Sequence, residues 1–309
     1  MQTLWLPDGP LEIVAGTPPG GGLDRTARAL QKAIDVAHLV EVPLTVRNVP
    51  GDGARKAWAY MDTHRGNPRV VSISHPNLTS DRLVGLADFD HRSYTAIAML
   101  YTEYIAFVVR SDSALRNGED LLQRLGTDAP GMSVALSTAL GNPNHIALGR
   151  LALHAGADPK APLIRVFDSA VDAVADVISG KAQVAAVTAA SAIAALGSGE
   201  ARVLGVSAPE RLPGVLRTVP TWREQSVDCV VGAWRGIAGA AGIGESHVEY
   251  WVRTLAAAAS TDTWLSDLER QGVSPCLTTG AALHDFLERE RSDTATALKA
   301  LGLLRAAPA

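Results

Sequence analysis

A glycine-rich turn near the N-terminus carries the residue types best suited to bind an anion. Residues 16–24 read Gly-Thr-Pro-Pro-Gly-Gly-Gly-Leu-Asp and lie between a short apolar run, residues 11–15, and a segment with helical apolar spacing. Glycines leave main-chain N–H groups uncovered, and N–H groups close to a helix N-terminus bind anions. We therefore expect this loop to hold a carboxylate. The alternative is a plain chain reversal in which Asp24 only caps the helix.

The same glycines do not form a nucleotide-binding motif. Gly20, Gly21 and Gly22 are contiguous, whereas dinucleotide sites need G-x-G-x-x-G, and no Gly-Lys-Ser/Thr follows them. The sequence also lacks Gly-x-Ser-x-Gly, His-Glu-x-x-His and any pair of histidines at metal-ligand spacing. We therefore expect no catalytic residues, no metal and no cofactor.

Two further loops extend the candidate site in the first third of the chain. Residues 43–48 and 69–74 read as strands, and each is followed by a polar turn before a helical pattern: Asn48 to Gly53 after the first, His75-Pro76-Asn77 after the second. With residues 11–15 they make three strand–helix units. In a parallel sheet the loops after the strands lie at one edge, which is where open α/β sheets bind ligands.

A second set of strand–helix units follows in the middle of the chain. Residues 132–136, 163–167 and 182–187 read as strands, and the turns after them carry hydroxyl, amide and carboxylate groups: Ser137, Thr138 and Asn142; Asp168 and Ser169; and Thr188. Residues 202–207 form one more predicted strand. Residues 95–100, 104–110 and 228–238 are apolar runs, and from residue 245 the pattern is helical to the end.

This order predicts two α/β lobes. Lobe one comprises residues 1–105 with 235–309, and lobe two comprises residues 106–234. The chain would cross between them near residues 104–110 and 231–236. Two crossing strands make a hinge, so we expect the lobes to close around a ligand in the cleft between them.

Composition excludes several classes of partner. The 309 residues are 47% hydrophobic, the formal charge is −4, and no basic run stands out, which argues against nucleic acid. No apolar stretch approaches the roughly 18 residues of a membrane span, so we expect no membrane insertion. Cys229 and Cys276 suit neither a zinc site nor a disulfide framework; buried free thiols are favoured over one disulfide. Residues 1–10 lack a signal-peptide pattern, which leaves a cytoplasmic protein or a leader replaced by the initial methionine.

Three side chains in or near these loops have structural and functional interpretations. For His75 and His145, a hydrogen-bonding or helix-start role is favoured over catalysis, although with Asp24 and Asp168 they could form an acid–base set. Trp234 is expected to pack at the hinge, although an aromatic ligand would make use of it.

Taken together, several short motifs resemble the solute receptors of tripartite tricarboxylate transporters, the Bug family of extracytoplasmic binding proteins. The similarity covers essentially the whole chain, and the order and spacing of the motifs are specific. They are Ile13-Val14 through Pro18-Pro19-Gly20-Gly21 with Asp24 and Arg28, Asn48-Val49-Pro50-Gly51-Asp52-Gly53, Ser137 to Leu148, Gly180-Lys181-Ala182-Gln183-Val184, Glu210-Arg211 to Val219-Pro220-Thr221, and Trp234-Arg235-Gly236.

The resemblance implies a type II periplasmic-binding fold of the Venus-flytrap kind, and a monomeric, non-enzymatic transport receptor in the periplasm. It would close over a small carboxylate, whether a dicarboxylate, an amino-acid-like acid or an aromatic acid, and deliver it to the membrane subunits of the transporter. The alternatives are an α/β enzyme acting on a small carboxylate or a phosphorylated substrate, and a receptor that feeds a sensor. The expected ligand-binding residues are Thr17, Gly20, Gly21, Gly22, Asp24, Ser74, His75, Asn77, Ser137, Thr138, Asn142, Asp168, Ser169, Thr188 and Trp234.

One departure from the family pattern bears on the ligand. The family often has Tyr-Lys-Gly-Gly where this chain has Phe167-Asp168-Ser169-Ala170. An acid in place of a lysine would suit an ammonium or hydroxyl group on the ligand, so Asp168 is expected to influence which ligand is bound.

Overall fold

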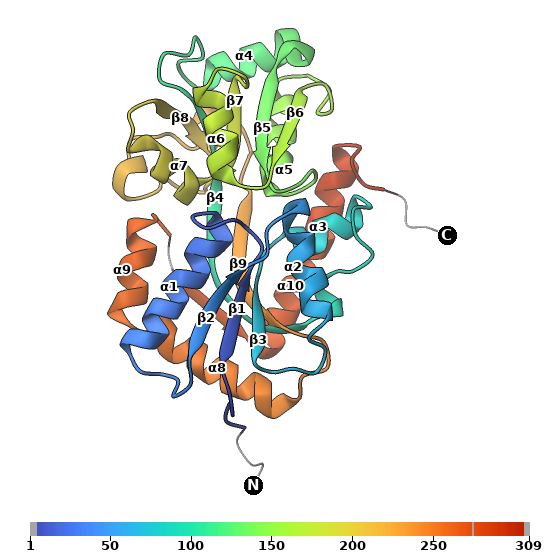
Figure 1. The fold of residues 1–309 in the computed structure, drawn as a ribbon. Coiled ribbons are helices and arrows are strands. Elements are labelled where there is room, and N and C mark those ends of the chain that lie inside the picture. The colour runs from blue at the N-terminus through green and yellow to red at the C-terminus, as the bar shows by residue number, and fades with distance from the viewer. Residues whose placement is uncertain (1–4, 274, 306–309) are drawn as a thin grey trace. The chain divides into compact units, whose positions relative to one another are not determined.

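The structure, a computed structural model, describes residues 5–273 and 275–305 (Figure 1). Within these residues the chain divides into two compact units. Unit 1 comprises residues 5–82, 87–102 and 234–292, and unit 2 comprises residues 83–86, 103–233 and 293–305. The strands β4 (Thr95–Arg110) and β9 (Gly232–Gly239) each run from one unit into the other.

Unit 1 is built on a mixed sheet with the strand order β2-β1-β3-β9-β4, and β10 also pairs with β4. β1 (Leu11–Ala15) pairs in parallel with β2 (Leu44–Asn48) and β3 (Val70–Ser74). β9 runs antiparallel to β3, and β10 (Pro275–Thr279) antiparallel to β4. The helices that begin in this unit are α1 (Gly22–Val36), α2 (Arg55–Asp62), α3 (Asn77–Leu83), α8 (Glu245–Ala259), α9 (Asp262–Arg270) and α10 (Gly280–Ala300).

Helices cover both faces of the unit 1 sheet. On one face the apolar side of α1, including Leu30 and Ile34, packs with α8 and α9 against β1 and β3. On the other face α2 and α3 contribute Trp58 and Leu78 to a second cluster against Val14. This two-sided covering explains why the strands read as apolar runs rather than as an alternating pattern.

Unit 2 repeats this plan with a sheet in which β6, β5, β7 and the second half of β4 are neighbours. β5 (Ser133–Ser137) pairs in parallel with β6 (Leu163–Phe167) and β7 (Val184–Thr188), whereas β7 and β8 (Ala201–Val206) pair antiparallel to β4. Of its helices, α4 (Gly118–Asp128) and α5 (Pro143–His154) share one apolar cluster, and α6 (Ala170–Ile178) and α7 (Ala189–Leu196) share another.

The predicted strand–helix units are confirmed in both halves of the chain, but several expectations were wrong. The two apolar runs at residues 95–100 and 104–110 belong to one strand, since the polar residues between them continue the extended chain. β10 interrupts a region expected to be wholly helical; it is a short edge strand whose exposed residues lack a strong apolar pattern.

Two differences concern the C-terminal region. Residues 293–305 group with unit 2 rather than with the first lobe, because Leu298 and Leu301 are buried in the unit 2 core. Both cysteines are free: Cys229 is buried as expected, but Cys276 is exposed on β10. No helix in the described ranges is both long and apolar enough to cross a bilayer.

The core role of α1 can be tested by one pair of substitutions on the same helix. Leu30 is 1% exposed and Val36 is 59% exposed. Leu30→Ala should lower the free energy of unfolding by about 2–5 kcal/mol, because it removes packed methyl groups and leaves a cavity. Val36→Ala should change it by less than about 0.5 kcal/mol. Urea unfolding followed by circular dichroism measures both; equal losses would contradict this assignment of the buried face.

Candidate functional site

Strand register brings three parts of unit 1 to one edge of its sheet. Val14 on β1 is opposite Ser72 on β3, so both strands point their carboxyl ends the same way. Ser74, the last residue of β3, is opposite Gly236 on β9. The β1–α1 loop, the turn after β3 and the start of β9 therefore share this edge, which is where ligands bind in open α/β sheets.

The β1–α1 loop is held by the side chain of Asp24, which is 2% exposed. Its carboxylate accepts hydrogen bonds from the Gly20 N–H at 2.8 Å, from Asn48 Nδ2 at 2.8 Å and from Arg28 Nε at 2.9 Å. Thr17 Oγ1 accepts the Asp24 N–H at 3.1 Å. Asp24 thus ties the turn to β2 and to α1. It is not the helix N-cap, which is Gly21.

The ionised form of Asp24 is the one that this network stabilises. Burial raises the pKa of the carboxyl group, but the hydrogen bonds from Gly20, Arg28 and Asn48 together outweigh burial and hold the pKa below its ordinary value. All its close partners are donors from the protein. Asp24 therefore shapes the loop, and its carboxylate is already fully occupied within unit 1.

The N–H groups of the three loop glycines differ in whether the protein itself supplies a hydrogen-bond acceptor. The Gly20 N–H is bound to Asp24, and the Gly21 N–H donates to Pro18 O at 2.9 Å, so neither is open as the glycine pattern suggested. The N–H groups of Gly22 and Leu23, the first two residues of α1, meet no acceptor among the described residues. The open donors of the loop lie at the start of the helix rather than in the turn before it.

The turn after β3 contributes buried polar groups to the same edge. His75 is 3% exposed, and its Nε2 has no hydrogen-bond partner in the described structure. Burial, with a smaller effect of the Arg235 guanidinium, lowers the pKa of His75 to about 3, opposed by a hydrogen bond with Asn77. His75 is therefore neutral at pH 7. Ser74 and Asn77 are also buried.

In unit 2, the predicted residues after β5 mostly bind one another. Asn142 is the N-cap of α5, and its Nδ2 donates to Ser137 O at 2.7 Å and to Thr138 Oγ1 at 3.0 Å. Asn144 Nδ2 donates to Ser137 Oγ at 2.9 Å. Thr138 has a φ of 72°, a left-handed conformation that is strained for a β-branched residue and is often found at functional sites.

His145 has the helix-start role that was favoured for it. Its N–H donates to Asn142 Oδ1 at 3.1 Å, and its Nδ1 accepts the Gly141 N–H at 3.0 Å. Burial lowers the pKa of His145 to about 4, so it is neutral at pH 7.

In the turns after β6 and β7, the one charged side chain is solvent-exposed. Asp168 is exposed and makes no hydrogen bond or ion pair with the described residues. Ser169 is the N-cap of α6, accepting the Asp172 N–H, and Thr188 Oγ1 lies 3.0 Å from Ser191 Oγ. Of the predicted unit 2 residues, Asp168 is the one whose side chain is most available to a ligand.

Arg235 lies beside the start of α1, a position that the sequence analysis did not predict for it. A Cβ placed on Gly22 would lie 3.8 Å from Arg235 Nη2 and 3.9 Å from Arg25 Nη2. The one feature of the sequence that could have identified Arg235 is that it is a single charged residue inside an apolar run. The neighbouring Trp234, by contrast, packs in an apolar cluster with Met99, Leu283 and Leu287, in line with the packing interpretation.

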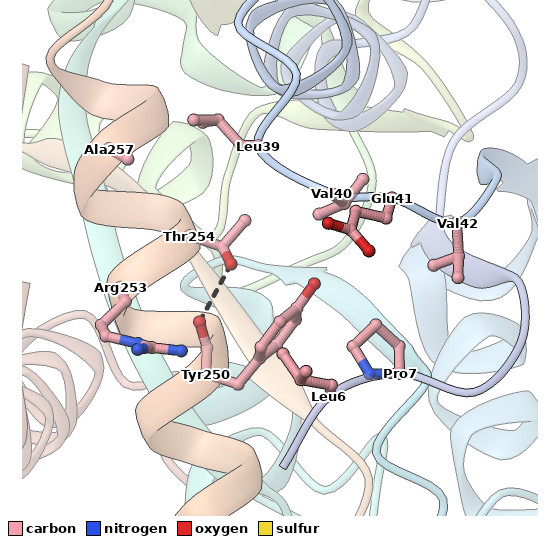
Figure 2. A pocket seen from close by; sticks show the side chains of 10 residues that line it. All are labelled: Leu6, Pro7, Leu39, Val40, Glu41, Val42, Tyr250, Arg253, Thr254 and Ala257. Carbon is pink, nitrogen blue, oxygen red and sulfur yellow. Dashed lines mark hydrogen bonds between the residues drawn. The ribbon is translucent and has the colours of Figure 1, made fainter. Parts of the chain in front are cut away.

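Two cavities of the described chain lie away from these loops. One of about 380 Å³ in unit 1 is lined by residues that precede β1 and β2 and by α8, among them Leu6, Val40, Glu41, Tyr250 and Arg253 (Figure 2). It lies at the amino ends of the strands, opposite the loops described above. Within the described ranges no group of His, Cys, Asp or Glu side chains is arranged to hold a metal ion.

Replacing Asp24 tests its role in the loop. Asp24→Asn should lower the free energy of unfolding at pH 7 by about 1–3 kcal/mol, because an amide cannot accept all three bonds. The folded-state pKa lies below the ordinary 3.8, so Asp24 stabilises the fold above pH 4, and this contribution is lost as the pH falls through the folded pKa. The difference from wild type should therefore shrink in acid. The control is Asp35→Asn, on the exposed side of α1; a loss as large in the control would count against the network.

Asp81 on α3 has the opposite pH dependence. It is 1% exposed, and Arg55 Nη1 lies 3.3 Å from Oδ2. Burial raises the pKa of Asp81 to about 7, against the opposing effect of Arg55. The folded state therefore binds a proton more tightly than the unfolded state, so wild-type stability should fall by on the order of 2–4 kcal/mol from pH 4 to pH 8 through this group. Asp81→Asn should flatten this slope in urea titrations; an unchanged slope would contradict the prediction.

Comparison with known proteins finds no family model that matches the chain. The chain is 24% identical over 293 residues to the UPF0065 protein in the tcbD-tcbE intergenic region of a Pseudomonas species, covering 93% of this chain and 84% of that one. Solved structures share the fold, and three of them are compared with this chain. The periplasmic binding protein BugD matches with a TM-score of 0.85 at 17% identity, over 97% of this chain and 100% of that chain.

The other two come from Rhodopseudomonas palustris and contain ligands. Rpa4515 with adipate has a TM-score of 0.87 at 18% identity, over 96% of this chain and 98% of that chain. MatC with bound malate has a TM-score of 0.82 at 18% identity, over 95% of this chain and 100% of that chain. These likenesses establish the periplasmic-binding-protein fold. The chain is a homologue of the UPF0065 protein and has the fold of the Bug-type solute-binding proteins.

Proposed function

We propose that the protein is an extracytoplasmic solute receptor that binds a small carboxylate and delivers it to the membrane subunits of a tripartite tricarboxylate transporter. The homology to a UPF0065 protein and the fold support this proposal, as do the structural neighbours with malate and adipate. The periplasm is the compartment that this role requires.

The observation that carries the proposal is the open start of α1. Gly22 and Leu23 present two adjacent N–H groups at the positive end of a 15-residue helix, on a loop that Asp24 holds in place. A carboxylate has two oxygens and one negative charge, so it can accept both bonds and also interact favourably with the helix dipole. A neutral solute would lack the favourable interaction with the helix dipole.

The ligand-binding residues that we propose follow from this arrangement. In unit 1, Gly22 and Leu23 donate to the acid group, Thr17, Gly20, Gly21 and Asp24 shape the loop, and Ser74, His75 and Asn77 supply further polar contacts. In unit 2, Asp168 and Thr138 act on the other end of the ligand, with Ser137, Asn142, Ser169 and Thr188 supporting their turns. Closure of the two units about β4 and β9 is part of the proposal.

An acid–base enzyme is disfavoured by the protonation states of its candidate residues. The pKa values of His75 and His145 are lowered to about 3 and about 4, so neither imidazole is a useful base at pH 7. Asp24 is committed to three donors within unit 1, from the loop, β2 and α1.

A thermal-shift screen of small carboxylic acids on ligand-stripped protein tests the proposal. A true ligand at about 100 times its Kd adds about 2.7 kcal/mol to the free energy of unfolding, which raises Tm by several degrees. The screen should include malate and adipate, with their amides as neutral controls. Shifts from phosphate esters or nucleotides, with none from carboxylates, would contradict the receptor assignment.

Gly22→Val should abolish carboxylate binding without unfolding the protein. The added side chain would stand over the open N–H groups, and its Cβ would meet only the ends of two flexible arginines. The matched control is Gly197→Val at the end of α7, where a Cβ also meets little. Isothermal titration calorimetry with the best ligand from the screen measures the loss. Wild-type affinity in Gly22→Val would refute the assignment of the α1 start.

A further inference from the structure

Unit 1 has a cavity at the amino ends of its parallel strands, away from the start of α1. Its volume is about 380 Å³. One wall is the side of α8 that carries Tyr250, Arg253 and Thr254, the facing wall is the chain of residues 39–42 that leads into β2, and residues 6–7 line one end (Figure 2). Sites for small molecules typically have volumes of about 300–1,000 Å³, so this cavity is large enough for a ligand.

Much of the cavity lining is apolar and uncovered. Leu6 is 65% exposed, the highest fraction among the exposed large apolar side chains that the structure describes. Leu39, Val40 and Val42 line the facing wall, and each of them is only partly buried. An apolar group seated here would remove this surface from water, which is the main favourable contribution to ligand binding in an apolar pocket.

Two side chains of opposite charge border this apolar lining. Glu41 precedes β2 and Arg253 belongs to α8, so they come from facing walls. Both are exposed, and neither makes a hydrogen bond or an ion pair with a residue that the structure describes. Arg47 in the same unit, by contrast, binds Glu12 at 2.7 Å. The charges of Glu41 and Arg253 are therefore available to a ligand.

The phenol group of Tyr250 indicates that the two charges act at one place. Tyr250 is 5% exposed, and in Figure 2 its ring lies between Arg253 and Glu41. Burial raises the pKa of Tyr250 above its ordinary value; a hydrogen bond with Thr254 and the charge of Arg253 oppose this effect, and the charge of Glu41 adds to it. Because one phenol group feels both charges, a small molecule that lies against this ring can reach both.

We propose that this cavity is a second ligand site, which binds a small zwitterion with an apolar side chain, the chemical class of the apolar α-amino acids. The ammonium group pairs with Glu41, the carboxylate pairs with Arg253, and the side chain packs on Leu39 and Val42. A simple carboxylic acid would leave Glu41 unpaired and be repelled by it, and a simple amine would be repelled by Arg253. The site is separate from the start of α1, and the inference does not depend on the proposed function.

Methyl NMR with L-leucine as the probe locates this site. The methyl signals of Leu39, Val40 and Val42 should shift and saturate as leucine is added, and the Kd is taken from these signals. Two analogues each lack one charged group: 4-methylpentanoate has no ammonium group, and 3-methylbutylamine has no carboxylate. Each should bind in the cavity at least about tenfold more weakly than leucine, because it loses one charge-assisted hydrogen bond.

Charge variants test the two contacts one at a time. Glu41→Gln should weaken leucine binding about threefold to tenfold without weakening 4-methylpentanoate, and Arg253→Met should weaken leucine by a similar factor without weakening 3-methylbutylamine. The controls are Glu249→Gln, an exposed carboxylate on α8 that does not line the cavity, and Arg217→Met in unit 2; both should bind leucine as wild type does. A variant that merely distorts the cavity would weaken all three probes alike, and that result would overturn the contacts.

The remaining outcomes distinguish this inference from the proposed function. If leucine moves the amide signals of Gly22 and Leu23 but none of the cavity methyl signals, the second site is wrong and the receptor stands. If 4-methylpentanoate binds in the cavity as tightly as leucine, the zwitterion assignment is overturned. If leucine saturates the cavity signals and both charge variants behave as expected, the second site stands even where no carboxylate binds at the start of α1.

Discussion

The hydrogen bonds of the Asp24 carboxylate are the interaction on which the candidate site depends. Through them one buried side chain joins the turn after β1, the end of β2 and the second turn of α1. This fixes where α1 begins and therefore where its unpaired N–H groups point. The free energy of these bonds also offsets the burial of the charge. An acid group held by main-chain N–H groups relies on a rigid backbone, and Asp24 supplies that rigidity.

The two units use similar turns in different ways. In unit 1 the open groups are the Gly22 and Leu23 N–H groups at the start of α1, which favour an anion. In unit 2 the hydroxyls and amides after β5 are mostly paired with one another, and Asp168 is the exposed charge. The strained backbone of Thr138 fits a turn that is kept for contact rather than for stability.

Much of the fold follows from sequence pattern, because strands buried on both faces read as apolar runs and glycine or polar turns mark their ends. β1, β6 and the helix start at Pro143 are found where they were predicted. β10 could not be found this way, since an exposed edge strand needs no apolar run. β4 reads as two apolar runs because Thr102 and Glu103 interrupt its apolar pattern, although the extended backbone continues through them.

The site was predictable in place but not in detail. Glycine-rich turns identify an edge of the sheet, yet they cannot say which N–H groups the protein uses itself; Gly20 and Gly21 are occupied, whereas Gly22 and Leu23 are open. Which N–H groups are occupied depends on the hydrogen-bond partners of Asp24. One of these partners, Asn48, is 24 residues away along the sequence. Arg235 was missed for the same reason, since its approach to Gly22 is a tertiary contact.

The most direct test of the account is a ligand titration of isotope-labelled protein followed by amide NMR. On addition of a carboxylate that binds, the amide signals of Gly22 and Leu23 should move downfield, as N–H groups do when they acquire an anionic acceptor, whereas those of Gly20 and Gly21 should move little. Large shifts at Gly20 and Gly21 with none at Gly22 and Leu23 would contradict the account, because the acid group would then be held by the turn and not by the start of α1.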